Sequence, residues 1–406
     1  MKFCFLSPFS KETGTYYKSI CHGIGIMAAI ASKYHEVEVI AFSKIEEISN
    51  ISADYVLISS YSNQMKLVKD SIQKLSKKGI KCIVGGMHAT FSPEDFIDID
   101  YHILVRGEGE LFIKALMESE NDALSLPGVF KKGEKIKREY TPIIKDLDTL
   151  PFTLRYLFPT KKARNIMGFE VMTGRGCHYN CTYCSTPALR KIYPGYIRQR
   201  SPENVIKEIC DNSEGFPIIG FHDDHFLMNK KWLSKFLILY KKYVNKPFWC
   251  NSRVEAIDEE IILKLKNAGL KRIHMGVECA GYERRKKLLN RNITDDEIIN
   301  AFYLCKKNGI KTLSFNMIGL PDEDEKKIME LIKLNRIIDP EWIHVSIFQP
   351  YPGVALNKYC KDKSIDIPYT EHYYTLGTKD YLDGISGERL GYFLKNFVSL
   401  VKDKEN

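Results

Sequence analysis

Short apolar strand patterns alternate with amphipathic helix patterns along most of this 406-residue chain. Continuous apolar strands separated by helices long enough to serve as crossovers are typical of parallel sheets. The alternation occurs in two stretches, and a chain of this length accommodates two domains. The sequence therefore predicts an α/β protein built on two parallel sheets.

The first stretch predicts a doubly wound sheet of flavodoxin-like or Rossmann-like size. Its expected strands are residues 2–6, 36–41, 55–59, 81–84 and 102–105, and its expected helices are 23–32, 64–77 and 110–118. Ligands of such sheets bind outside the carboxyl ends of the strands. Glycines fall there, because Gly85 and Gly86 follow the fourth strand and Gly107 and Gly109 follow the fifth.

The second stretch predicts six strand–helix units, which form a full or partial (β/α)6 barrel of the TIM type. Its expected strands are residues 169–173, 218–221, 248–251, 272–276, 312–318 and 343–348, and its expected helices are 202–212, 230–243, 258–268, 295–308 and 323–336. Active sites of barrels gather at the carboxyl ends of the strands. Together the patterns divide the chain into a first domain at 1–125, a linker at 126–165 with a small hairpin near 128–139, a barrel at 166–350 and a tail at 351–406.

The bulk composition narrows the setting of the protein. No apolar run approaches the roughly 18 residues of a transmembrane helix, and polar residues follow the first strand at once, so we expect a cytoplasmic protein without a signal peptide. The formal net charge of +9 is spread over many lysines that are not interleaved with aromatic residues, so we expect no nucleic-acid partner. Eleven cysteines in such a chain are not a disulfide framework.

Three of these cysteines are clustered. Cys177, Cys181 and Cys184 have the spacing C-x3-C-x2-C and directly follow the first expected barrel strand. Three thiolates on one glycine-opened loop can bind three irons of a [4Fe–4S] cluster, which leaves the fourth iron open to a substrate. A zinc site and a chance cluster are the alternatives, although His178 is adjacent to Cys177 and is poorly placed to complete a zinc tetrahedron.

This cysteine motif, with Tyr183 before its last cysteine, resembles the signature of the radical S-adenosylmethionine (radical SAM) superfamily. Residues 220–226, 275–278, 289–291 and 315–321 resemble the passages with which that family binds S-adenosylmethionine. The alternatives for single residues are a helix cap, a structural ion pair or a surface position. The resemblance assigns contacts with S-adenosylmethionine to Tyr183, Asp223, Asp224, Glu278, Arg291 and Asn316.

The first domain resembles the cobalamin-binding domain found in one subclass of these enzymes. Residues 84–90 are similar to its glycine-rich turn and residues 105–110 to its arginine-to-glutamate turn. The motif D-x-H-x-x-G is absent, so the resemblance implies binding without an axial histidine; His22 as a cobalt ligand and a domain that has lost cobalamin are the alternatives. The implied cobalamin contacts are Ser59, Ser60, Gly85, Gly86, His88, Gly107, Glu108 and Gly109.

The two resemblances together imply a cobalamin-dependent radical SAM enzyme. It would cleave S-adenosylmethionine reductively at the cluster and methylate an unactivated carbon of a small-molecule or natural-product substrate, with flavodoxin or ferredoxin as electron donor. A radical cyclisation, ring contraction or other rearrangement is the second interpretation. A non-enzymatic cobalamin or iron–sulfur sensor is the third.

Overall fold

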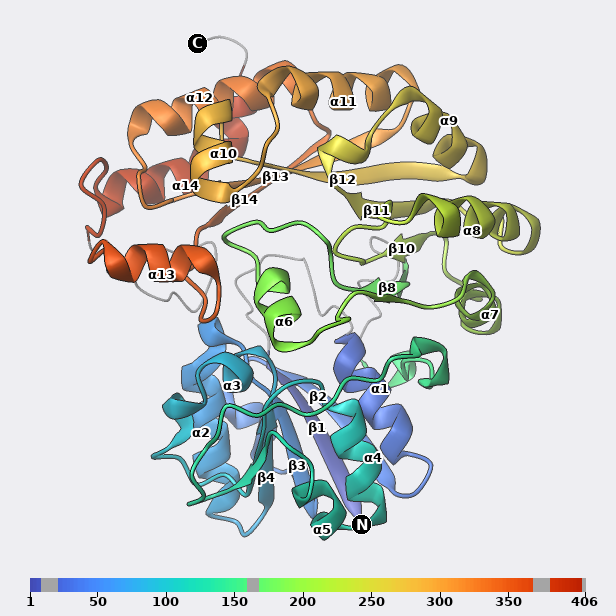
Figure 1. Cartoon of the computed structure of the whole chain (residues 1–406), viewed down its shortest axis with the longest axis vertical. Coiled ribbons are helices and arrows are strands. Elements are labelled where there is room, and N and C mark those ends of the chain that lie inside the picture. The colour runs from blue at the N-terminus through green and yellow to red at the C-terminus, as the bar shows by residue number, and fades with distance from the viewer. Residues whose placement is uncertain (9–20, 159–167, 368–379, 404–406) are drawn as a thin grey trace. The chain divides into compact units, whose positions relative to one another are not determined.

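The computed structural model describes residues 1–8, 21–158, 168–367 and 380–403 (Figure 1). They belong to two compact units, Met1–Ala163 and Arg164–Asn406. Residues 126–158, which the sequence suggested as a linker, lie with the first unit, and the described residues after 350 lie with the second.

The first unit is built on a six-stranded sheet of order β2-β1-β3-β4-β5-β6. Its first five strands are parallel, and the sixth is antiparallel to β5. The strands are β1 (Lys2–Pro8), β2 (Glu36–Phe42), β3 (Tyr55–Ser59), β4 (Lys81–Gly85), β5 (Ile103–Val105) and β6 (Val129–Lys131). The hairpin expected near residues 128–139 is therefore wrong, because Val129–Lys131 pairs with β5 instead of with a neighbouring segment.

Helices cover both faces of this sheet, because its central strands are apolar on both sides. Phe3 and Phe5 pack with α1 and α4, whereas Cys4 and Leu6, which alternate with them along β1, pack with α2 on the opposite face. The α-helices of the unit are α1 (His22–Ala31), α2 (Met65–Ser76), α3 (Met87–Phe91), α4 (Glu110–Glu118) and α5 (Glu120–Leu124).

The second unit contains six parallel strands in the order β14-β13-β12-β11-β10-β7. They are β7 (Phe169–Val171), β10 (Ile219–Phe221), β11 (Phe248–Ser252), β12 (Leu270–Glu278), β13 (Lys311–Ile318) and β14 (Trp342–Ile347). Strands β7 and β14 are the two edges of this sheet in the described part of the chain, so the barrel is partial. A two-stranded ribbon of β8 (Gly174–Arg175) and β9 (Arg198–Gln199) stands apart from it.

Most helices of the second unit share one large core with one face of its sheet. Alternate strand residues such as Cys250, Ile273 and Val345 enter that core, so their neighbours in sequence face the other way. The α-helices are α6 (Thr186–Ile192), α7 (Pro202–Asn212), α8 (Lys230–Tyr243), α9 (Glu259–Ala268), α10 (Tyr282–Leu289), α11 (Asp295–Lys307), α12 (Glu325–Ile338), α13 (Ala355–Asp362) and α14 (Gly387–Lys402).

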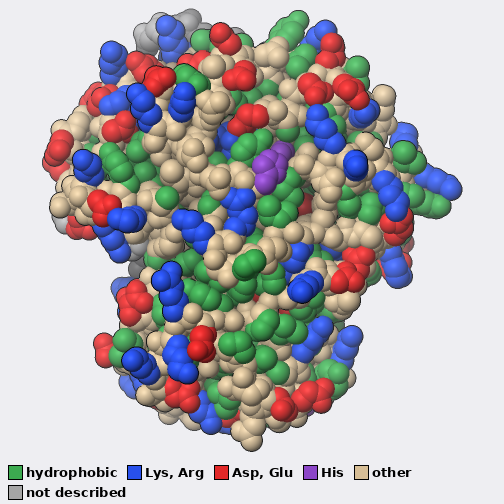
Figure 2. All heavy atoms as spheres, viewed as in Figure 1, with side chains coloured by type: hydrophobic (Ala, Val, Ile, Leu, Met, Phe, Trp, Pro, Cys, Tyr) green, Lys and Arg blue, Asp and Glu red, His purple; other side chains and the backbone are tan. Residues whose placement is uncertain are grey.

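The structure bears on the expected spread of surface charge and on the expected absence of a membrane-spanning helix. On the face drawn in Figure 2, Lys and Arg side chains are interspersed with Asp and Glu side chains. Within the described residues, no helix is long and apolar enough to span a membrane.

Candidate functional site

The three clustered cysteines lie on the loop between β8 and α6, residues 177–184, which we call the cysteine loop. The loop is fixed by hydrogen bonds at both of its ends. Thr182 donates from its backbone N to Leu289 O (3.2 Å) and from Oγ1 to Leu288 O (2.6 Å). Arg190 of α6 donates to two backbone carbonyls of the loop at 2.6 and 3.1 Å. These hydrogen bonds hold the segment that carries the three cysteines.

The cysteine thiols are largely sheltered from water. Cys177 and Cys181 are 9% and 7% exposed, and burial raises the pKa of Cys177 and raises that of Cys184 to about 11. Arg253, just after β11, donates from Nη1 to Cys181 Sγ at 2.9 Å, and its guanidinium lies 3.7 Å from the ring centroid of Tyr179. A charge-assisted donor of this kind suits a sulfur that serves as a metal ligand.

The cysteine loop offers the donor set of an iron–sulfur cluster. Among residues 1–8, 21–158, 168–367 and 380–403, no three His, Cys, Asp or Glu side chains converge on a point where one metal ion would be held. A cubane cluster does not require the cysteines to meet at one point, because each cysteine binds a separate iron. Three thiols on one short loop, with a guanidinium beside Cys181, fit this requirement.

A buried network of charges lies next to the cysteine loop. Arg291, 2% exposed, donates from Nη1 to Glu278 Oε1 (3.0 Å) and from Nη2 to Gly276 O (3.0 Å). Tyr183, on the loop itself, donates to the same Glu278 oxygen at 2.9 Å. Glu255 lies 3.7 Å from Arg291 and also contacts Arg253. The structure therefore brings three of the predicted residues, Tyr183, Glu278 and Arg291, to one place.

The backbone at the end of β12 makes room for this network. Glu278 has a φ of 69°, and the register of β12 with β13 shifts between Gly276 and Glu278. A Cβ added at Gly276 would lie 2.2 Å from Glu278 Oε1 and 2.8 Å from Arg291 Nη1. Glycine is required at position 276 because the carboxylate and the guanidinium occupy the space of a side chain.

The electrostatics of the network leave N–H donors available. Burial raises the pKa of Glu278; burial also opposes ionisation of Glu255, yet Arg291 and Arg253 outweigh it and lower the pKa of that carboxyl. The Nε atoms of Arg253 and Arg291 are buried and have no acceptor among the described residues. Two unpaired guanidinium N–H groups fit a ligand carboxylate, such as that of S-adenosylmethionine.

The two predicted aspartates have different surroundings. Asp223, 5% exposed, accepts hydrogen bonds from Thr173 N (3.1 Å) and Thr173 Oγ1 (2.7 Å), so its carboxylate connects the ends of β7 and β10. Asp224 accepts from Thr186 Oγ1 at 3.4 Å, and burial raises its pKa. Asp224 therefore lies toward the cysteine loop, whereas Asp223 is engaged in holding the strands together.

We expect Asp223 to make stability depend on pH. Burial raises its pKa from 3.8 to about 6, so between these values the native state binds more protons than the unfolded state and stability falls as pH rises. The charged form costs on the order of 3 kcal/mol above that window. In Asp223→Asn this dependence should weaken, because only the contribution of Asp223 is removed while Glu323, whose pKa burial raises to about 7, still titrates; unfolding midpoints across the window measure it. An exposed control, Asp211→Asn, should keep the dependence of the unchanged protein; an equal dependence in Asp223→Asn would contradict the assignment.

The Asn316 side chain does not belong to this group of residues. Its Nδ2 donates to Ser314 Oγ (3.0 Å) and His344 O (3.2 Å), and its Oδ1 accepts from Asn335 Nδ2 of α12 at 2.8 Å. The side chain therefore faces the helices, and the amide is fully used there. We leave Asn316 out of the proposed site, since its position in the alternation of β13 points it away from Glu278 and Arg291.

In the first unit, the predicted glycine turns lie at the carboxyl ends of two adjacent strands, β4 and β5. Gly86 has a φ of 95°, and a Cβ there would lie 2.8 Å from Ser60 N and O. Ser60 is fully buried; its Oγ donates to Gly85 O (2.6 Å) and accepts from Ala89 N (3.1 Å). The Ser60 side chain thus holds the turn, while Ser59 lies at the end of β3 against Gly86. The contacts of both serines with cobalamin stay predictions.

His88 is likewise engaged within the unit. It is 4% exposed, with Nδ1 2.8 Å from Ser62 Oγ and Nε2 2.8 Å from Asp95 Oδ2, so both ring nitrogens already have partners. Burial lowers its pKa. These two bonds hold the ring within the unit, and the contact between His88 and cobalamin stays a prediction. His22, the alternative cobalt ligand, has Nδ1 3.3 Å from Thr153 Oγ1.

The second glycine turn is fixed by threonines. Gly107 N donates to Thr90 Oγ1 (2.9 Å), and Glu108 O accepts from Thr141 Oγ1 (2.6 Å). Gly109 is the residue before α4, and a Cβ there would lie 2.5 Å from Met27 Sδ. The turn is thus a fixed backbone surface at the edge of the sheet where ligands of this fold class bind.

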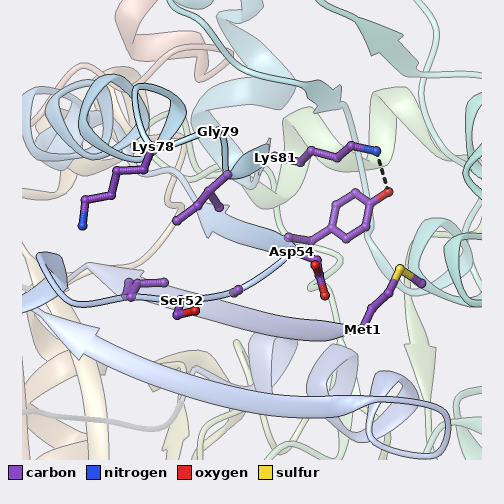
Figure 3. A pocket seen from close by; sticks show the side chains of 10 residues that line it. Met1, Ser52, Asp54, Lys78, Gly79 and Lys81 are labelled. Atoms are coloured by element: carbon purple, nitrogen blue, oxygen red, sulfur yellow. Dashed lines mark hydrogen bonds between the residues drawn. The ribbon is translucent and has the colours of Figure 1, made fainter.

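The pocket drawn in Figure 3 lies elsewhere in the first unit. Residues at the amino-terminal ends of β3 and β4 and the start of the chain line it, among them Met1, Asp54 and Lys78. Lys81 Nζ donates to Tyr55 OH (3.1 Å) within it. Because the glycine turns follow the carboxyl ends of the strands, this pocket is not part of the candidate site.

Sequence reasoning missed Arg253 and Glu255. Both follow directly on β11, at the carboxyl end where active-site residues of barrels gather. Their position after a strand could have indicated a site role from the sequence. Their contacts with Cys181 and Arg291 could not be predicted from the sequence, because they depend on how separate strand ends approach one another.

Comparison with known proteins gives two family models that match the chain. The Radical SAM superfamily matches residues 171–334, and the B12 binding domain matches residues 15–117. The chain is 30% identical to an uncharacterized methyltransferase of Pyrococcus horikoshii, over 83% of this chain and 77% of that protein. It is 22% identical to the bacteriochlorophyllide d C-8(2)-methyltransferase of Chlorobaculum tepidum, over 87% of this chain and 79% of that enzyme.

Solved structures show a similar fold. The radical S-adenosylmethionine methyltransferase TsrM from Kitasatospora setae superposes with a TM-score of 0.68 at 15% identity, covering 88% of this chain and 76% of TsrM. The cobalamin-dependent radical enzyme OxsB gives 0.66 at 18% identity, covering 89% of this chain but 56% of OxsB. The predicted fold class, a B12-binding domain followed by a radical SAM barrel, is confirmed.

Proposed function

Since this chain belongs to the radical SAM superfamily, and within it to the proteins that carry a B12-binding domain, we propose that it is a cobalamin-dependent C-methyltransferase. Its substrate is a small molecule with an unactivated carbon. The observation that carries the proposal is the contact of one buried charge network with the cysteine loop, through Arg253 to Cys181 and through Tyr183 to Glu278.

In the proposed site, Cys177, Cys181 and Cys184 hold the [4Fe–4S] cluster. Arg291 orients the methionine carboxylate through its unpaired Nε, and Glu278 accepts hydrogen bonds from the ribose hydroxyls. When bound, the cluster and the cobalamin supply a reducing electron and a transferable methyl group.

The remaining residues position these groups. Arg253 keeps a positive charge beside Cys181, and Asp224 lies toward the loop from the carboxyl end of the adjacent strand β10. In the first unit, the turns at Gly85–Gly86 and Gly107–Gly109 present backbone to which cobalamin can approach closely, with Ser59 and Glu108 at the same edge. Flavodoxin or ferredoxin is the proposed electron donor.

The proposal predicts two by-products in equal amounts. One S-adenosylmethionine is cleaved to 5′-deoxyadenosine and methionine, and a second, as methyl donor, leaves S-adenosylhomocysteine. Protein reconstituted without oxygen, with iron, sulfide, hydroxocobalamin and a reductant, should therefore form both with product in roughly a 1:1 ratio. Chromatography with mass detection measures them across a panel of small molecules.

Each other outcome points to a different function. Deoxyadenosine without S-adenosylhomocysteine would favour a radical rearrangement. Absence of both by-products, with cluster and corrinoid bound, would favour a sensor. Failure to retain hydroxocobalamin, judged by the corrin absorption, would remove the main support for methyl transfer.

A further inference from the structure

A row of aromatic rings crosses the sheet of the second unit on the face turned away from its helices. Trp249, His274, Phe315 and His344 lie on the adjacent strands β11 to β14, and none belongs to the core shared with the helices. Trp249 and His274 stack with centroids 4.7 Å apart; Phe315 meets His274 at 6.0 Å and His344 at 5.2 Å. We call these four residues the ring row.

The ring row lies on the same face as the proposed S-adenosylmethionine site. His274 and Gly276 are two residues apart on β12 and so point the same way. The carboxylate of Glu278 occupies the space above Gly276, as its 2.2 Å approach to a Cβ at that position shows. Trp249 is fully buried and His274 is 5% exposed, whereas Phe315 and His344 are half buried, so the row reaches the surface at its β13–β14 end.

His274 carries an acceptor that no described residue uses. Its Nδ1 lies 3.1 Å from Asn251 Oδ1, and Asn251 Nδ2 donates to Asp223 O at 3.4 Å. With the amide oriented in this way, Oδ1 accepts and Nδ1 carries the proton, so Nε2 has a lone pair. That Nε2 is buried and has no hydrogen-bond partner among the described residues.

The surroundings keep this imidazole neutral. Burial, then Arg272, His222 and His344, lower the pKa of His274 well below its usual value. The Arg272 guanidinium lies 5.3 Å from the Trp249 ring centroid, so a cationic ligand would be repelled here. A buried lone pair left unpaired is costly, which points to a ligand that donates a hydrogen bond.

We propose that His274 positions the substrate by accepting a hydrogen bond at Nε2 from an N–H or O–H group of a planar, uncharged ring. This inference rests on the proposed function, because it assigns the ring row to the substrate of that reaction. Ring faces and edges favour a flat partner, and the single acceptor fixes how that partner is turned toward Glu278.

The test uses two probes of the same shape. Indole has a ring N–H, whereas benzofuran has an oxygen in its place. Isothermal titration of the reconstituted full-length protein should show that indole binds about 10-fold more tightly than benzofuran. His274→Phe, which keeps a ring but removes the acceptor, should abolish the preference, and His274→Gln, which restores an acceptor oxygen, should recover part of it.

Phe315→Leu is the matched control. It should weaken the binding of both probes to the same extent and leave the ratio of their affinities unchanged, because it removes a ring without changing the His274 acceptor. Equal affinities of indole and benzofuran for the unaltered protein would overturn the inference, since they are expected if a water molecule donates to Nε2. The absence of indole binding would overturn it too. Neither outcome depends on whether the variants fold. Deoxyadenosine formation in the same preparation reports on the proposed function separately.

Discussion

Cys181→Ala should yield a protein that retains no iron–sulfur cluster and cleaves no S-adenosylmethionine. Cys181 is the middle of the three proposed cluster ligands on the cysteine loop, and its sulfur accepts a hydrogen bond from Arg253 at 2.9 Å. Its removal takes away one of three ligands and leaves a buried guanidinium without its sulfur acceptor. Iron and sulfide analysis, the visible absorption spectrum and the yield of deoxyadenosine measure the effect.

Cys210→Ala is the control for this experiment. Its thiol is exposed on α7, and its only hydrogen bond in the described structure is a long one, 3.8 Å to Tyr243 O. The control should keep full iron content and activity. A full cluster in Cys181→Ala, or its loss in Cys210→Ala, would show that the cysteine loop has been wrongly assigned.

The arrangement of strands and helices was predictable because each element carries its own signal. Helices α4, α7 and α8 begin and end at the predicted residues. Pro202 starts α7, the Asn229 side chain caps α8, and α4 begins after Gly109 with Glu110 in its first turn. The pairing of β6 with β5 escaped prediction, because three residues give no period and the pairing is a contact between distant segments.

The candidate site was predictable in kind but not in every residue. Glycines at strand ends and the cysteine spacing are local signals, so the carboxyl edge of each sheet was predicted as the place of a site. Which polar side chains turn toward a ligand depends on contacts between distant segments and has no local signal. Ser60, His88 and Asn316 were candidates by position, but each has an internal partner on another segment, and Asn335 of α12 is the clearest case.

Arg291→Met should destabilise the second unit and should also weaken the binding of S-adenosylmethionine. Arg291 is 2% exposed and faces Glu278 and Glu255, so its loss leaves buried carboxylates without a counter-charge at a cost of about 3–5 kcal/mol. The lost charged hydrogen bond should lower affinity by roughly 10- to 150-fold. Calorimetry measures both effects. Arg389→Met, which breaks an ion pair with Glu325 in which both side chains are 45% exposed, should leave stability and S-adenosylmethionine affinity nearly unchanged.

A second substitution separates stability from binding. In Glu278→Gln/Arg291→Met the buried carboxylate that lost its partner is also gone, so much of the lost stability should return. Affinity for S-adenosylmethionine should stay low, because neither the guanidinium nor the carboxylate is present to receive it. Arg291→Lys keeps the charge but cannot contact Tyr183, Glu278 and Gly276 O together, so it should fold and still bind weakly. Unchanged affinity in the stable double variant would mean that Arg291 and Glu278 form a structural ion pair and that S-adenosylmethionine is held elsewhere.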